Sequence, residues 1–188
     1  DTMKFSEFKR IICVDMSRYP RNPKNSLLSA YRIHPGFRFT FWYRLCQILL
    51  TRPRLKVLLR IARWKYLRVQ LATGIQIPIL ADIDEGLYIP HFGGIVVNPG
   101  FRAGKNLYLS HNVTIGKVHV GDREGVPSVG DGVFLGTGAV LLGAIHLGDN
   151  VAVGANSVVI NHLPADAFAV GTPAKVVSSV GASGVLGG

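Results

Sequence analysis

The chain of 188 residues has few cysteines, and it lacks the short motifs by which several enzyme classes are recognised. Its two cysteines, Cys13 and Cys46, have no metal-ligand spacing, so they predict free thiols in a reducing compartment. No two histidines have the i, i+4 arrangement of a zinc-binding helix, and there is no P-loop and no GxSxG sequence. The sequence therefore gives no support to zinc, nucleotide or serine-hydrolase sites of these kinds, and we expect no metal.

Long hydrophobic runs are also missing. The most apolar stretch, residues 37–50, has 14 residues, too few to cross a bilayer as one helix. Basic residues are absent after Val129 except for Lys175, although the formal net charge is +10. The positive charge is concentrated between Lys4 and Arg68, where it predicts contact with an anionic surface or only a solvated helix face. No nucleic-acid-binding motif accompanies this charge, so we expect no nucleic acid partner.

What the sequence does contain is an apolar residue at every sixth position, followed at most steps by glycine. An α-helix repeats at 3.6 residues and a strand at 2, so a sustained period of six predicts neither. It is typical of a hexapeptide β-helix, in which each hexapeptide forms one short strand and a turn, and about 18 residues make one triangular coil. The apolar positions are Val129, Leu135, Leu141, Leu147, Val153 and Val159.

The same period predicts where the repeat begins and where it is interrupted. An isoleucine returns every six residues over 77–89, and the period resumes at Val97 after a shift of two residues. The segment 118–128 fits no repeat and predicts a loop extruded from a corner, where substrate contacts tend to lie. We therefore expect three parts: a basic helical N-terminal region (1–72), a mainly β, left-handed parallel β-helix (73–177) and a flexible tail (178–188).

The N-terminal region predicts helices rather than repeats. Asn25 or Ser26 can cap a short helix, and Pro53 separates the apolar run 37–50 from a basic amphipathic run over 55–71. The apolar stripe of this last run predicts packing against the β-helix or a neighbouring subunit, and its basic and aromatic residues are also typical of helices at a membrane interface. The stripe contains Leu55, Leu58, Leu59, Ala62, Tyr66 and Val69.

His91 is the first candidate for chemistry. It lies at the two-residue shift of the repeat, and such a shift leaves a gap between coils of a solenoid. Gly93 and Gly94 follow it and leave the backbone beside it bare. An imidazole in that gap can be partly exposed and can reach a ligand at a subunit boundary.

Residues 74–177 resemble the hexapeptide-repeat acyltransferases, most closely the serine O-acetyltransferase branch. The matching motifs are, in order, GLYIPHFGGIVVN, LSHNVTIG, GDRxxxP, VGDGVFLGTGAVLLG, VGANSVV and VGTPAKVV. The resemblance implies a homotrimer that transfers an acetyl group from acetyl-CoA to a hydroxyl, with His91 as the general base. It also implies that Lys175 meets the CoA phosphate as a point charge. The residues implied to line the rest of the CoA site are Gly116, Lys117, Thr137 and Ala155.

The acceptor side departs from the pattern of that branch. Pro90 stands where the family has an Asp before the histidine, and Gln76 stands where it has the Asp of the dyad. The family's loop sequence Asp-Arg-His is replaced by Asp122-Arg123-Glu124. The residues expected at the acceptor are Arg123, Glu124, Gln76 and Asp82, with Asp82, Asp84 or a backbone carbonyl orienting His91.

These departures remove the carboxylates that would hold the ammonium group of serine. The short basic N-terminal region resembles the exopolysaccharide and capsule O-acetyltransferases of bacteria, which act near the inner membrane on lipid-linked sugars. We therefore expect a cytoplasmic enzyme, peripheral at the inner membrane, that acetylates a sugar hydroxyl in surface polysaccharide synthesis. The alternatives are serine acetylation for cysteine synthesis, and a β-helix that is non-catalytic or resembles carbonic anhydrase, with His91, His111 and His119 converging across an interface.

Overall fold

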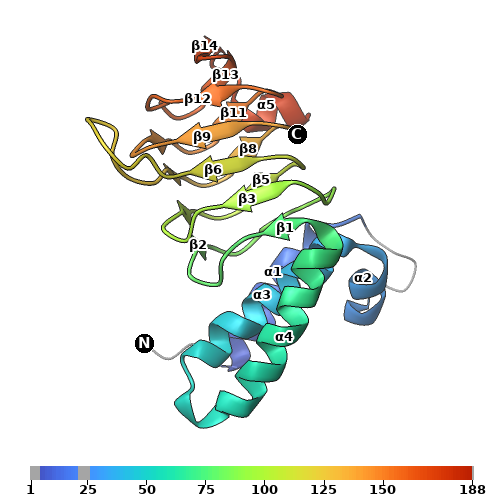
Figure 1. Ribbon diagram of the computed structural model, residues 1–188. Helices are drawn as coiled ribbons and strands as arrows, with labels where there is room; N and C mark the ends of the chain where they lie inside the picture. The colour runs from blue at the N-terminus through green and yellow to red at the C-terminus, as the bar shows by residue number, and fades with distance from the viewer. Residues whose placement is uncertain (1–4, 21–25, 188) are drawn as a thin grey trace.

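The computed structural model describes residues 5–20 and 26–187, which form a helical bundle followed by a β-helix (Figure 1). Among these residues, no helix combines the length and the apolar character needed to cross a bilayer. The bundle contains α1 (Phe5–Ser17), α2 (Leu27–Ile33), α3 (Pro35–Leu50), the short 3-10 helix η1 (Pro53–Leu55) and α4 (Lys56–Thr73).

Local sequence signals determine where these helices begin and end. The hydroxyl of Ser26 caps α2 by accepting from the backbone N–H of Ser29 at 3.2 Å, as expected, whereas Asn25 lies outside the described residues. Helix α4 ends at Gly74, whose positive φ of +66° favours glycine. The turn signals of the sequence gave no indication of α1, which is amphipathic and packs against α3.

Three sheets form the faces of the β-helix, and consecutive coils add one parallel strand to each sheet. Sheet A contains β1 (Ile75–Gln76), β3 (Ile95–Val97), β6 (Thr114–Gly116), β9 (Val140–Leu142) and β12 (Val158–Val159). Sheet B contains β2 (Asp82–Ile83), β4 (Arg102–Ala103), β7 (Ser128–Val129) and β10 (His146–Leu147). Sheet C contains β5 (Tyr108–Leu109), β8 (Phe134–Leu135), β11 (Ala152–Val153), β13 (Phe168–Gly171) and the antiparallel β14 (Ala174–Ser178). The prediction of a left-handed parallel β-helix is confirmed.

The residues of the six-residue period form the core of the prism. All six apolar positions between 129 and 159 are buried, and equivalent residues stack in register, as Leu109, Leu135 and Val153 do along sheet C. Full burial of one such aliphatic side chain stabilises the fold by about 1.5–3 kcal/mol. The tight corners use left-handed residues, and at Gly94 a Cβ atom would come within 2.1 Å of the Asn112 side-chain oxygen.

A buried ion pair joins the bundle to the first coil. Arg44 of α3 donates to the carboxylate of Asp15 in α1 at 2.9 Å, and it also donates to the backbone oxygens of Ile83 and Asp84. The same carboxylate accepts from the backbone N–H groups of Gly86 and Leu87. Burial raises the pKa of Asp15, while Arg44 and the two N–H groups oppose that shift. Buried polar groups therefore bond the helical bundle directly to the first coil of the β-helix.

Two segments lie on the outside of the β-helix, and the structure agrees with the prediction for one of them and differs from it for the other. The loop expected over 118–128 does protrude from a corner, held by a backbone pair between Val118 and Gly125 (Figure 1). The tail from residue 178, expected to be flexible, instead contains α5 (Gly181–Leu186). Its Ala182 is buried and donates its backbone N–H to the Asn150 oxygen at 2.7 Å, which anchors the helix on the prism.

Candidate active site

The residues predicted for the site lie on two different edges of the triangular prism. We call the column of corners between sheets C and A edge 1, and the column between sheets A and B edge 2. Edge 1 carries His91, Thr137 and Ala155, and edge 2 carries Gly116, Lys117, Arg123 and Glu124.

Edge 1 is a continuous column, because each corner is bonded to the next. The Asn112 N–H donates to Gly93, the Gly138 N–H to His111 and the Asn156 N–H to Thr137, at 2.9, 3.1 and 2.8 Å. The Thr172 hydroxyl donates to the Asn156 oxygen at 3.4 Å, so the turn that leads to Lys175 in β14 stands on the same column. Four steps of about 4.8 Å separate His91 from this turn, a length of about 19 Å.

His91 is exposed at the base of edge 1. Space beside it is open, since a Cβ atom on Gly93 would meet nothing within 4 Å. The His91 ring lies edge-on to the ring of His111 one coil above, with 5.9 Å between centroids. The Nδ1 atom of His111 is buried and has no hydrogen-bond partner among the described residues. The sequence placed His111 only in the carbonic-anhydrase-like alternative, and its position one coil above His91 is the signal that could have linked the two rings.

Edge 2 carries the protruding loop. Lys117 is exposed directly after β6, and the Arg123 guanidinium donates to the backbone oxygen of Ile160 at 3.2 Å. Glu124 is exposed beside it. The base of the loop encloses a hollow of about 360 Å³, lined by Val118, Val120, Gly121, Asp122, Arg123, Leu142 and Ile160.

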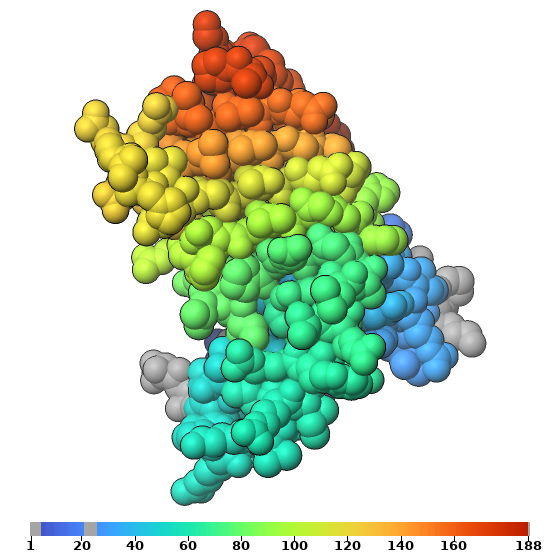
Figure 2. Space-filling model, viewed as in Figure 1, coloured from blue at the N-terminus to red at the C-terminus, as the bar shows by residue number. Residues whose placement is uncertain are grey.

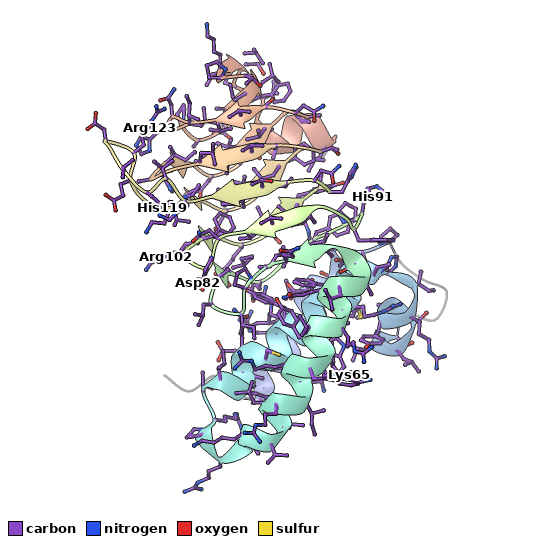
Figure 3. All side chains as sticks on the ribbon, viewed as in Figure 1. Lys65, Asp82, His91, Arg102, His119 and Arg123 are labelled. Atoms are coloured by element: carbon purple, nitrogen blue, oxygen red, sulfur yellow. The ribbon has the colours of Figure 1, made fainter. Side chains whose placement is uncertain are left out.

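The two edges do not meet within one chain. Figure 3 shows His91 on one side of the prism, and Arg123 and His119 on the other. A site that contains both His91 and Arg123 therefore needs edges from two copies of the chain. Of the three histidines of the carbonic-anhydrase-like alternative, His91 and His111 share edge 1 and His119 lies on edge 2, and the described residues of one chain contain no cluster of three or more side chains able to hold a metal ion.

Of Gln76 and Asp82, two of the residues expected at the acceptor, only Gln76 lies close to the corner of His91. Gln76 is exposed on sheet A and pairs with Val96, and the preceding corner at Gly74 packs under Gly93. Asp82 belongs to sheet B and lies on the side opposite His91 (Figure 3). The expectation that Asp82 orients His91 of the same chain is therefore wrong, because the coil turns a corner between them.

Comparisons with known proteins define the class of this chain. Residues 127–161 match the family model "Bacterial transferase hexapeptide (six repeats)". The serine acetyltransferase of Helicobacter pylori strain 26695 is 36% identical over 146 residues, which cover 78% of this chain and 83% of the relative. The crystal structure of serine acetyltransferase from Brucella abortus superposes with a TM-score of 0.78 at 28% identity, covering 95% of this chain and 72% of that one.

A further solved structure bears on the donor. A serine acetyltransferase in complex with CoA superposes with a TM-score of 0.74 at 29% identity, covering 92% of this chain and 71% of that one. The fold and the repeats define a hexapeptide-repeat transferase. Within that class, the chain belongs to the serine acetyltransferase family, and it is an acyltransferase.

These findings correct the expectation drawn from the acceptor side. The relatives are serine acetyltransferases, and none of them supports a particular closeness to the exopolysaccharide enzymes. The prediction of a sugar hydroxyl as acceptor is therefore wrong, and the serine alternative is favoured. The error came from treating Pro90, Gln76 and Glu124 as losses against a family pattern, each on its own.

Proposed function

We propose that the protein transfers the acetyl group of acetyl-CoA to the hydroxyl of serine, at sites formed between edge 1 of one copy and edge 2 of another in a homotrimer. The observation that carries this proposal is the 36% identity to a serine acetyltransferase across 83% of that relative's length. The division of the candidate residues between two edges supports a site shared by two copies.

His91 acts as the general base. It takes the proton of the serine hydroxyl while the hydroxyl oxygen attacks the thioester carbonyl, and backbone N–H groups stabilise the oxyanion that forms. The carbon–sulfur bond then breaks, the departing thiolate receives the proton from His91, and O-acetylserine and CoA leave. The exposure of His91 and the open space at Gly93 give both substrates access to the imidazole.

Edge 1 fits the extended donor. Its corners above His111 carry small side chains at Thr137 and Ala155, which leave room for a ligand along the column. CoA would lie along this edge, with its thioester at His91 and its phosphates at the exposed Lys175. Gly116 and Lys117 of the neighbouring copy's edge 2 would close the other side of the channel.

The loop on edge 2 can hold both charged groups of serine. Arg123 would bind the carboxylate with its two parallel N–H donors, and Glu124 would take the ammonium group. Gln76, near the corner of His91, would orient the imidazole by a hydrogen bond without adding charge. We keep the domain division at residues 1–72, 73–177 and 178–188 as part of this proposal, with the catalytic chemistry assigned to the β-helix.

A thiol-release assay with L-serine tests the acceptor. We expect serine to drive release of CoA, and we expect Arg123→Ala to raise the KM for serine at least about tenfold, because a charge-assisted bidentate contact is lost. Arg54→Ala is the matched control, since Arg54 is also exposed but lies in η1 of the helical bundle, outside both edges, and its KM for serine should not change.

Substrate analogues separate the roles of the two loop residues. Serine methyl ester lacks the carboxylate, and N-acetylserine lacks the ammonium group, so each should be a poor acceptor for the unaltered enzyme. For the Glu124→Gln variant, N-acetylserine should no longer be a poorer acceptor than serine, whereas serine methyl ester should remain a poor acceptor. Absence of thiol release with serine at any concentration would contradict the proposed function.

We also propose that the reaction takes place in the cytoplasm. Cys13 is exposed and Cys46 is buried, and both are free thiols, which is the usual state in a reducing compartment. Attachment to a membrane surface is a separate matter and concerns α4.

A further inference from the structure

Helix α4 presents a second apolar face that packs against no described part of the chain. Its inner face is buried at Ala62 and Tyr66, as predicted, although Leu55 and Leu58 of the predicted stripe are exposed. The outer face is formed by exposed side chains, of which Val57 and Leu71 are 73% and 76% exposed. Its members are Val57, Leu58, Ile61, Trp64, Leu67 and Leu71, which we call the outer stripe.

The outer stripe lies at the surface of the bundle. Figure 1 shows α4 in front of α1 and α3, and Figure 2 shows its residues forming the visible face of that part of the molecule. A soluble surface rarely leaves so many large apolar side chains along one helix without a partner. The outer stripe therefore indicates a docking surface.

The charge around the outer stripe has one sign. No Asp or Glu occurs between Asp15 and Asp82, so α4 carries no acidic side chain. Exposed basic side chains lie beside the apolar ones and, at Arg60 and Arg68, between them on the same face of the helix, and Lys65 projects from the helix in Figure 3. They are Arg54, Lys56, Arg60, Arg63, Lys65 and Arg68.

Trp64 stands at the centre of this arrangement. It is half exposed, and the Lys65 ammonium and the Arg68 guanidinium each lie 5.1 Å from its ring. An indole with cations beside it has an apolar body and a charged rim, which is the combination found where a helix meets lipid headgroups.

We propose that the outer face of α4 binds an anionic lipid surface, with the helix lying in the plane of the interface, the outer stripe among the acyl chains and the six basic residues at the headgroups. Charge complementarity selects this occupant. A second α4 would place like charges against each other, and a nucleic acid would match the charge but leave the outer stripe exposed to water. The proposal is independent of which acceptor the β-helix uses.

Flotation with vesicles tests the proposal on the full chain. We expect binding to vesicles of phosphatidylcholine with one-third phosphatidylglycerol, little binding to phosphatidylcholine alone, and loss of binding as salt is raised. Neutralising Arg60, Arg63 and Arg68 to Gln should weaken binding at least about tenfold, because each basic residue near an anionic surface contributes to the affinity. The matched control replaces three exposed basic residues away from α4, Lys9, Arg32 and Arg102, by Gln, and it should bind like the unaltered chain.

A second pair of measurements addresses the outer stripe. Trp64 fluorescence should shift to shorter wavelength on anionic vesicles, and Ile61→Ser should reduce both the shift and the binding without changing acetyl transfer to serine. Equal binding by the α4 triple variant and the unaltered chain would overturn the proposal. Two other results would also overturn it. If the unaltered chain bound no vesicles and the triple variant changed its oligomeric state, the face would belong to a second copy. If the unaltered chain bound RNA and not vesicles, the face would belong to a nucleic acid.

Discussion

Replacement of His91 by Ala is expected to lower the rate of acetyl transfer at least about a hundredfold, the usual contribution of a general base. The variant should keep its fold, because the His91 side chain is exposed and contributes to packing chiefly by its edge-on contact with the His111 ring. Without the His91 imidazole, the proposed general base is missing. The loss should therefore appear in kcat, measured by thiol release at saturating serine and acetyl-CoA.

The control for this variant is His146→Ala. His146 is also an exposed histidine on the β-helix, but it belongs to sheet B and bonds to the Ser128 hydroxyl. Its removal should leave kcat within about twofold of the unaltered enzyme, since it touches no proposed substrate. Near-normal turnover by His91→Ala would take the general-base role away from His91.

Replacement of Asp15 by Ala is expected to destabilise the protein by about 3–5 kcal/mol, because it leaves a buried guanidinium without its counter-ion. The Arg44 side chain is 4% exposed, and water cannot replace the lost carboxylate. The change also removes the acceptor of the Gly86 and Leu87 N–H groups at the first coil. The measurement is the midpoint of denaturant unfolding, followed by circular dichroism.

An ion pair with an exposed lysine and a largely buried carboxylate provides the comparison. Lys105 lies 3.4 Å from Glu85, and its side chain is 51% exposed, so Lys105→Ala should cost no more than about 1 kcal/mol. Equal midpoints for the Asp15 and Lys105 variants would show that the Asp15–Arg44 pair does not hold the bundle on the β-helix.

The β-helix could be predicted because its signal is local and repeated. Each coil places a residue such as Leu135 or Leu141 inside the same narrow prism, so the period in the sequence is the period of the structure. The extruded loop and the two-residue shift at His91 were found as breaks in that period. The corners of positive φ are occupied mostly by glycine and asparagine, with Asp166 in the same conformation.

Other features depend on how separate segments meet, and the sequence did not contain them. The period gives the order of the corners but not that His91 and Arg123 occupy different edges. The pairing of Asp15 with Arg44 joins α1 to α3 and the first coil, and neither residue has a sequence signature. Helix α5 was missed because its glycine-rich sequence resembles a linker, whereas its contact with Asn150 holds it in place.

The acceptor was predicted wrongly for a different reason. The prediction compared three residues, Pro90, Gln76 and Glu124, one at a time with a family pattern. The similarity of the whole chain to serine acetyltransferases favours serine as the acceptor instead. A bound substrate is held by the sum of charges around it. In the proposed site, Glu124 supplies a carboxylate beside the Arg123 guanidinium, one partner for each charge of serine.

The most direct measurement of the shared site is the activity of mixed assemblies. Chains carrying His91→Ala and chains carrying Arg123→Ala are co-expressed in equal amounts, and activity is measured at low serine, where each variant alone is nearly inactive. In a random trimer with one site per interface, about one site in four combines an intact His91 with an intact Arg123 from two different copies. We predict recovery to about a quarter of the unaltered activity; an activity equal to the mean of the two separate variants would contradict a site formed by two chains.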